Sequence, residues 1–237
     1  MSRTVILFVS MIFSLSLFGQ SFWFGTKSGG ALNWQSWGNG LGSGLNRQQL
    51  FSVPADIFIE SYDEENKGSL YASLGYRVKG SSFRVISTFG DFAAFQGFKF
   101  RNLQLETGLK KGLNQEVWGM MPFYILGIRA EYNINTNLDD YRQFNNLFYP
   151  EDAFVKKFLY GFTAGGGLEK DVSEFARLFL EFVICPDVSF QYDQPQIFSV
   201  VDPFTRQTIN LEERLVRNLS MEFKIGIKFL RKVEYID

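Results

Sequence analysis

The sequence predicts an all-β fold: an eight-stranded antiparallel up-and-down transmembrane β-barrel with short periplasmic turns and longer outer loops. Three observations support this prediction. Apolar and polar residues alternate over eight segments, the connections between these segments alternate in length, and the chain begins with the pattern of an export signal. Aromatic residues make up 17% of the 237 residues, yet the mean hydropathy is −0.06. This combination favours alternating strands over apolar helices.

The first twenty residues predict a secretory signal peptide. Arg3 precedes an apolar run from Val5 to Phe18, and the small residue Gly19 follows it. A basic start, a short apolar region and a small residue at the cut are typical of such signals. The apolar run is shorter than the ~20 residues that a spanning helix needs. We therefore expect residues 1–19 to be removed and residues 20–237 to form a single barrel domain.

Eight strands are predicted along the remaining chain. The fifth alternates most clearly: its even positions are apolar or aromatic from Tyr124 to Ile134, whereas its odd positions include Arg129 and Glu131. Successive side chains of a strand point to opposite faces, so this segment has one apolar and one polar face. The eight predicted strands cover residues 22–34, 51–60, 70–79, 102–110, 124–135, 157–169, 177–184 and 218–229.

The connections between these strands alternate between short and long. Three are short, at residues 61–68, 112–121 and 171–175. Four are long, at residues 35–49, 80–100, 136–155 and 189–215. This order places both chain ends on the side of the short connections, which is the topology of bacterial outer-membrane barrels.

The polar face carries charged residues on every predicted strand, nine of them basic and seven acidic. They are Lys27, Asp56, Glu60, Arg77, Lys79, Glu106, Lys110, Arg129, Glu131, Lys157, Glu169, Arg177, Glu181, Glu222, Lys224 and Lys228. In a membrane the apolar face turns to lipid and these charges turn inward. An eight-stranded barrel has room inside only for side chains, and pairing makes buried charge tolerable. We therefore predict a lumen plugged by a charge network, although periodicity alone leaves the inverse arrangement of a soluble barrel open.

Aromatic residues near the predicted strand ends suggest girdles at the two membrane interfaces. They are Trp23, Trp34, Trp118, Tyr124, Tyr132 and Phe229.

The chain contains no histidine, which argues against a Ser-His-Asp hydrolase and against the usual zinc and copper sites. A carboxylate pair of Glu106 with Glu131 remains conceivable, but the nearby Lys110 and Arg129 favour a salt-bridge network. The sequence therefore predicts no catalytic site, no metal and no cofactor. The formal net charge of −1 gives no reason to expect nucleic acid as a partner.

The last long connection contains an apolar stretch with Ile197, Phe198 and Phe204. Apolar residues in an outer loop can mark a partner surface. They can equally form a hairpin over residues 197–211 with its turn at residues 202–206, and we favour the hairpin.

Several of these strands resemble the PorT-like outer-membrane β-barrel family, which is common in Bacteroidetes. The resemblance rests on FGTKSGGALNW, SLYASLGYRVKG, NLQLETGLKKGL, PFYILGIRAEYNI, YGFTAGGGLEKD and NLSMEFKIGIKF. It implies an eight-stranded barrel in the outer membrane. A few members of the family are accessory parts of type IX secretion and gliding machinery, and most have no assigned activity. The long last loop and the tail beyond Phe229 depart from the family pattern.

We expect a non-enzymatic, monomeric outer-membrane barrel that serves as a scaffold or interaction protein of the cell envelope. Its expected partners are outer-membrane lipid and another envelope or secretion protein. The alternatives are an accessory subunit of secretion or gliding machinery, a small-solute porin, and a soluble lipocalin-like barrel that binds a ligand.

Overall fold

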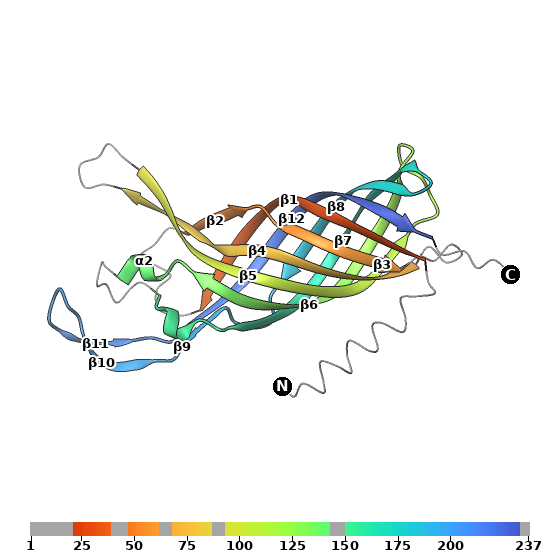
Figure 1. Ribbon diagram of the computed structural model, residues 1–237. Coiled ribbons are helices and arrows are strands. Elements are labelled where there is room, and N and C mark those ends of the chain that lie inside the picture. Colours follow the sequence, from red (N-terminus) through yellow and green to blue (C-terminus); the bar gives the residue numbers. More distant parts are fainter. Residues whose placement is uncertain (1–20, 39–46, 62–67, 87–92, 143–149, 233–237) are drawn as a thin grey trace, which may run out of the picture.

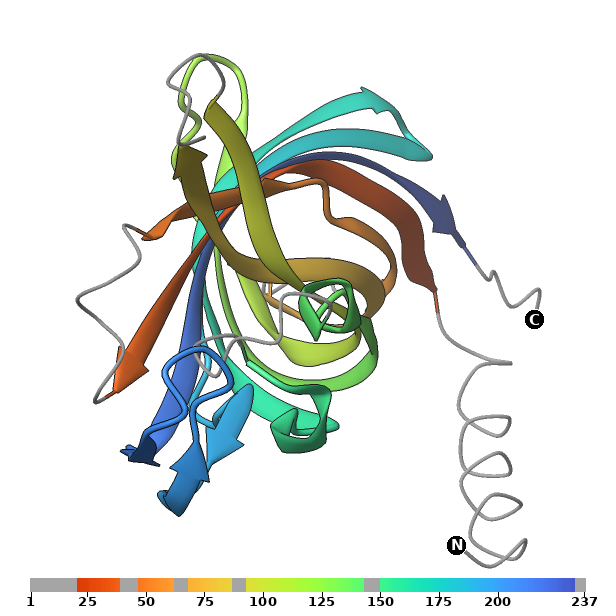
Figure 2. The same cartoon turned by 90° about the vertical axis from the view of Figure 1, so that its left-hand side faces the viewer.

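The computed structural model describes residues 21–38, 47–61, 68–86, 93–142 and 150–232. In this part of the chain, eight antiparallel strands close into one ring (Figures 1 and 2). They are β1 (Phe22–Gly38), β3 (Ala55–Ser61), β4 (Gly68–Ile86), β5 (Ala93–Gly112), β6 (Met121–Thr136), β7 (Phe158–Ser173), β8 (Ala176–Pro186) and β12 (Arg214–Arg231). The strand β12 closes the ring by pairing with β1 from Phe22 opposite Arg231 to Gly38 opposite Leu215. The predicted fold class is confirmed.

The alternation along each strand decides which side chains lie inside the ring. On β6, the side chains of Leu126 and Ile128 are 55% and 59% exposed, whereas Arg129 and Glu131 are buried. The same pattern holds on β12, where Phe223 and Ile225 are exposed and Lys224 is buried. The apolar face is therefore the outer surface, and the charged face fills the lumen. This orientation is that of a membrane barrel and the opposite of a soluble lipocalin-like barrel.

The segment that follows β1 forms two strands instead of one. The prediction of a single continuous strand over residues 51–60 is therefore wrong. The segment is divided into β2 (Arg47–Ser52) and β3 at Val53 and Pro54. Proline has no backbone N–H to donate to a neighbouring strand, which explains the break. A side chain of β1 bonds to the backbone at this break: Ser28 Oγ donates to the Pro54 carbonyl at 2.8 Å.

The two ends of the barrel differ. At one end, two residues connect β7 to β8, and the first and last strands begin and end together at Phe22 and Arg231. We call this the short-turn end, and the opposite end the long-loop end (Figure 1). The long connection predicted over residues 80–100 is wrong, because β4 and β5 continue through most of it and still pair at Ile86 and Ala93.

The long-loop end carries the remaining elements. They are α2 (Asp139–Arg142), a 3₁₀ turn (Asp152–Phe154), β9 (Tyr192–Gln194), β10 (Ile197–Val201) and β11 (Thr208–Leu211). The hairpin of β10 and β11 forms a separate two-stranded sheet that projects beyond the barrel (Figure 1). The Asp202 N–H donates to the Gln207 carbonyl at 2.9 Å across its turn. The hairpin predicted from the sequence is confirmed.

The helical segments among the described residues lack the length and the apolar composition of a membrane span. The predicted signal peptide at residues 1–19 lies outside the described residues.

Candidate functional site

Sixteen charged side chains are buried in the described ranges, eight basic and eight acidic. They are Lys27, Asp56, Glu60, Arg77, Lys79, Glu106, Lys110, Arg129, Glu131, Glu169, Glu181, Asp187, Arg214, Glu222, Lys224 and Lys228. Such a group has no net charge, and most of its members lie within reach of a partner of opposite sign. We therefore treat the lumen itself as the candidate site.

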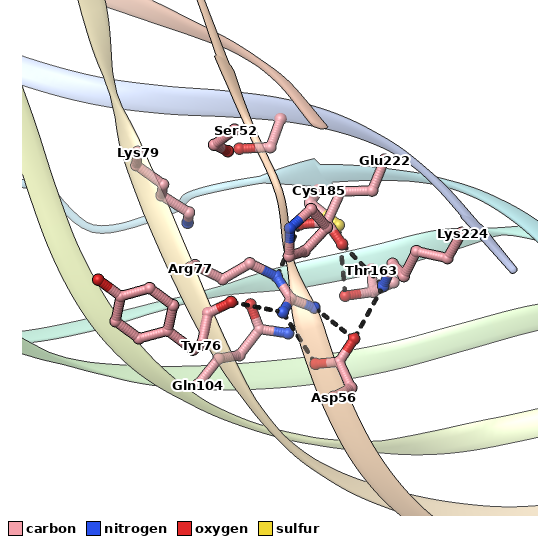
Figure 3. Close-up of polar contacts among 12 residues, drawn as sticks. Ser52, Asp56, Tyr76, Arg77, Lys79, Gln104, Thr163, Cys185, Glu222 and Lys224 are labelled. Carbon is pink, nitrogen blue, oxygen red and sulfur yellow. Dashed lines mark hydrogen bonds and ion pairs between the residues drawn. The ribbon is translucent and has the colours of Figure 1, made fainter. Parts of the chain in front are cut away.

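Arg77 is the centre of the charge network. Its side chain extends from β4 between Asp56 of β3 and Glu222 of β12 (Figure 3). The Arg77 Nη1 atom lies 2.8 Å from Asp56 Oδ1, and Arg77 Nε lies 2.8 Å from Glu222 Oε1. The planar guanidinium presents several donors in fixed directions, which suits a cation that must bond to two carboxylates. Gly75 makes room for this cluster, because a Cβ atom there would lie 1.8 Å from Asp56 Oδ1.

Lys224 joins the central cluster to the next carboxylate. Its Nζ atom lies 2.7 Å from Glu222 Oε2 and 3.3 Å from Glu181 Oε1. Lys27 approaches the same Glu181 from β1, at 2.8 Å. Because β12 lies between β1 and β8 in the ring, these contacts link three neighbouring strands around the closure of the barrel.

Asp187 is the main acceptor toward the long-loop end. Lys79 Nζ lies 2.8 Å from its Oδ1 atom, and Arg129 Nη2 also donates to Oδ1. Asn218 Nδ2 donates to the other oxygen at 2.8 Å. Glu131 shares both cations, at 2.5 Å from Lys79 and 3.3 Å from Arg129. The sequence analysis missed Asp187 because the predicted strand over residues 177–184 ended before it, although Asp187 continues the inward alternation of β8.

A ring of two lysines and two glutamates closes the short-turn end. Lys228 Nζ lies 2.9 Å from Glu169 Oε1 and 3.2 Å from Glu60 Oε1. Lys110 contacts both of the same carboxylates. Aromatic rings surround these ammonium groups, with Lys110 Nζ 4.1 Å from the centroid of Phe123. The negative face of an aromatic ring attracts a cation.

Trp23 belongs to this inner ring, so its predicted place in an outer girdle is wrong. Its side chain is 3% exposed, and its ring lies 4.9 Å from Lys228 Nζ and 4.7 Å from Arg177 Cζ. Arg177 itself is only partly buried, with 27% of its side chain exposed, and pairs with Asp171 and Glu169. Lys157 lies outside the lumen, because it precedes β7 and its side chain is exposed.

Glu106 differs from the other buried carboxylates. The Tyr71 hydroxyl donates to its Oε1 atom at 2.6 Å, and Gln104 Nε2 donates to its Oε2 atom at 2.8 Å. No ion pair to Glu106 is present among the described residues. The conceivable carboxylate pair of Glu106 with Glu131 does not form, because Glu131 contacts Lys79 and Arg129 instead.

Uncharged amides cross the lumen between the charge network and the long-loop end. Gln35 Nε2 donates to Asn218 Oδ1 at 2.9 Å. Asn218 and Asn102 both donate to Gln191 Oε1 at 3.3 Å, and Asn133 donates to Asn102 Oδ1 at 2.9 Å. We call these five side chains the amide row. It connects β1, β12, β5 and β6 through the segment that follows β8.

An apolar cluster lies beyond the amide row, toward the long-loop end of the barrel. We call it the aromatic cap, and it consists of Phe83, Phe98, Phe100, Leu138 and Tyr141. Three of its members extend inward from the ends of β4 and β5, and the other two come from the segment of α2. Figure 2, which faces the long-loop end, shows α2 in front of the opening of the ring. Charges, amides and aromatic rings thus fill the lumen in succession.

The β10–β11 hairpin contains the three residues of the predicted partner loop. Phe198 and Phe204 are 65% and 69% exposed, and Ile197 is partly exposed. The backbone N–H of Phe204 donates to Asp202 Oδ1 at 2.9 Å. This bond holds the pKa of Asp202 below its usual range.

No protein-family model matches the sequence, and neither does any curated protein. The resemblance to the PorT-like family therefore stays a prediction. Among solved structures, the outer membrane protein OprG from Pseudomonas aeruginosa matches with a TM-score of 0.56 and 11% sequence identity, over 91% of this chain and 98% of that chain.

Two other barrels match less well. The Neisserial surface protein NspA has a TM-score of 0.43 and 10% identity, over 88% of this chain and 96% of that chain. The outer membrane protein W of E. coli has a TM-score of 0.37 and 12% identity, over 89% and 98%. The likeness to OprG is one of fold, and the chain has the fold of eight-stranded outer-membrane barrels.

Proposed function

We propose that this chain is an integral outer-membrane protein with a closed lumen, and that it serves as a non-enzymatic scaffold or interaction protein of the cell envelope. The observation that carries the proposal is the combination of an apolar outer surface with an interior of paired charges. A soluble protein rarely exposes contiguous apolar surface of this kind.

The apolar surface forms a belt with basic residues at both margins. On β12, every outward side chain from Leu219 to Phe229 is apolar, and Arg217 and Arg231 lie exposed beyond the two ends. These eleven residues extend about 33 Å along the strand. At the usual strand tilt of about 40° this length covers about 25 Å, which is the height of the apolar band in outer-membrane barrels.

The filled lumen supports a role other than transport. Charged pairs, the amide row and the aromatic cap occupy the interior in succession, and an eight-stranded barrel has little room besides. A small-solute porin instead needs a water-filled channel. The absence of histidine agrees with a non-enzymatic role, because general acid–base catalysis most often uses that residue.

The β10–β11 hairpin is the part of the surface that best suits a protein partner. An isolated two-stranded hairpin is only marginally stable in water, and this one exposes Phe198, Val201 and Phe204. A partner that covers these side chains would stabilise it. If the protein is an accessory subunit of secretion or gliding machinery, we expect that machinery to bind here.

The experiment that tests the main proposal is reconstitution into phospholipid vesicles followed by recording in planar bilayers. We expect the folded protein to float with the vesicles, to resist extraction by urea and to give no channel conductance. Recovery in the soluble fraction would contradict a membrane location. Stable unitary conductance would contradict the closed lumen and favour the porin.

The partner surface is tested by capture from solubilised envelopes with the double variant F198A/F204A. We expect the variant to lose a partner that the wild-type protein retains. The matched control is F175A, because Phe175 is 55% exposed but lies in the β7–β8 turn at the opposite end. Retention of every partner by F198A/F204A would exclude the hairpin as the binding surface.

A further inference from the structure

A groove interrupts the apolar outer surface near the closure of the barrel. It has a volume of about 670 Å³, and its lining comes from the adjoining strands β8, β12, β1, β3, β4 and β5. Its volume falls within the range of about 300–1,000 Å³ that ligand pockets occupy. Most of its lining residues are outward residues of these strands, so the groove opens on the lipid-facing side.

Small side chains form the floor of the groove. Thr26 and Ser28 are outward residues of β1, and Ala55 lies opposite Ser28 on β3. Their neighbours on the outer surface are large: Ile227 lies opposite Thr26 on one side, and Tyr76 lies opposite Ala55 on the other. A patch of small residues bounded by Ile, Leu and Tyr side chains leaves a depression that no part of the described chain fills.

The surroundings of the groove decide what fills it. Ile57, Leu74, Leu178 and Ile225 line its walls, and they belong to the apolar belt. A bound water needs two to four polar partners, but the walls are apolar, the floor offers only the hydroxyls of Thr26 and Ser28, and Ser28 already donates to the Pro54 carbonyl. Water therefore gains little at this site. The medium that surrounds the belt is hydrocarbon, so the occupant available at every moment is a lipid chain.

We propose that this groove is a binding site for one acyl chain of the surrounding membrane lipid. The inference rests on the proposed membrane location, and it adds a site that distinguishes one side of the barrel from the rest. The large side chains at the walls contact the methylene groups along their length, while the small side chains of the floor let the chain approach the backbone. A lipid held in this way exchanges more slowly than its neighbours around the belt.

The test compares two Ala→Phe substitutions at exposed outward positions. Ala55→Phe fills the floor of the groove. Ala130→Phe is the matched control, because Ala130 is also an exposed outward residue but lies on β6, away from the groove. Each protein is reconstituted with dioleoyl phosphatidylethanolamine, transferred to detergent and examined by native mass spectrometry for the lipid that it retains.

We expect the wild-type protein and A130F to retain one lipid per barrel, and A55F to retain about tenfold less, because the phenyl ring takes the place of several buried methylene groups. Thr26→Leu fills less of the same floor, so the amount of lipid that it retains should lie between those of the wild-type protein and A55F. It replaces A55F in the test if A55F folds poorly. Equal retention by A55F, T26L and A130F in proteins that insert into vesicles would overturn the groove and leave the membrane location intact. Failure of the wild-type protein to enter vesicles would overturn both.

Discussion

Glu222 bonds to two buried cations, Arg77 at 2.8 Å and Lys224 at 2.7 Å. In the variant E222Q, one amide oxygen remains as an acceptor and the NH₂ group faces a cation. We expect E222Q to lower the free energy of unfolding by about 3 kcal/mol, because breaking a buried ion pair leaves an uncompensated charge. The measurement is the urea midpoint of the barrel folded in vesicles.

Glu106 makes the opposite prediction, because its partners are the neutral donors Tyr71 and Gln104. The Gln104 Oε1 atom has no hydrogen-bond partner in the described part of the chain. In E106Q, rotation of the Gln104 amide turns that oxygen toward the new NH₂ group. We expect the free energy of unfolding of E106Q to stay within about 1 kcal/mol of the wild-type value, which is the net contribution of one hydrogen bond. A loss as large as that of E222Q would mean that a cation balances Glu106.

Most of the individual lumen residues could be predicted from the sequence, since fourteen of the sixteen buried charges lie at predicted inward positions. The two exceptions are Asp187, which lies beyond the last alternating pair of β8, and Arg214, which lies before the last predicted strand at residues 218–229. Two further residues were predicted on the wrong face: Lys157 precedes the first residue of β7, and Trp23 is an apolar residue at an inward position. The alternation of apolar and polar residues in the sequence distinguishes the two faces of a strand. It does not show which apolar residue stacks on a cation inside the lumen.

At the level of elements, the β10–β11 hairpin should be sensitive to acid. The Asp202 carboxylate accepts the N–H of Phe204 and the hydroxyl of Thr205, and its pKa is lowered in the folded turn. The stability that the ionised Asp202 carboxylate gives to the turn is therefore fully present above the unfolded pKa of about 3.9. It is lost as the pH falls through the lower pKa of the folded turn. We expect the amide NMR signal of Phe204 to shift over this acid range.

The control for this prediction is D202N, in which the side-chain oxygen still accepts hydrogen bonds but no longer titrates. The Phe204 signal of D202N should not change over the same range. An acid shift that persists in D202N would assign the titration to another group.

The bounds of the strands were harder to predict than their number. Within the lipid belt one face is apolar and the other polar, so the period of two is visible in the sequence. Beyond the belt, β4 and β5 continue with Phe83, Phe98 and Phe100 turned inward to form the aromatic cap. In these strand ends apolar residues point into the barrel, so the alternation of apolar outward and polar inward residues no longer marks the strand. The break at Pro54 follows from the missing N–H, but not from alternation.

At the scale of the whole molecule, the apolar belt predicts a cost for charge on its outer surface. Ile128 is 59% exposed near the middle of β6. In a membrane, I128K should lower the free energy of unfolding by about 2–4 kcal/mol. The control is V201K on the hairpin, where Val201 is also 59% exposed and we expect a change within about 0.5 kcal/mol. Equal, small effects of both variants in vesicles would contradict the lipid belt.

The paired charges of the lumen also constrain the order in which the barrel is assembled. Lys27 and its partner Glu181 are 154 residues apart in the chain, and Asn33 and Ser220 are 187 residues apart. A hairpin that entered the bilayer alone would carry these groups without their partners, at high cost. We therefore expect the lumen to stay hydrated until the first and last strands meet, so that insertion and closure form one concerted step. N-terminal fragments that lack β12 should then have no stable state in lipid.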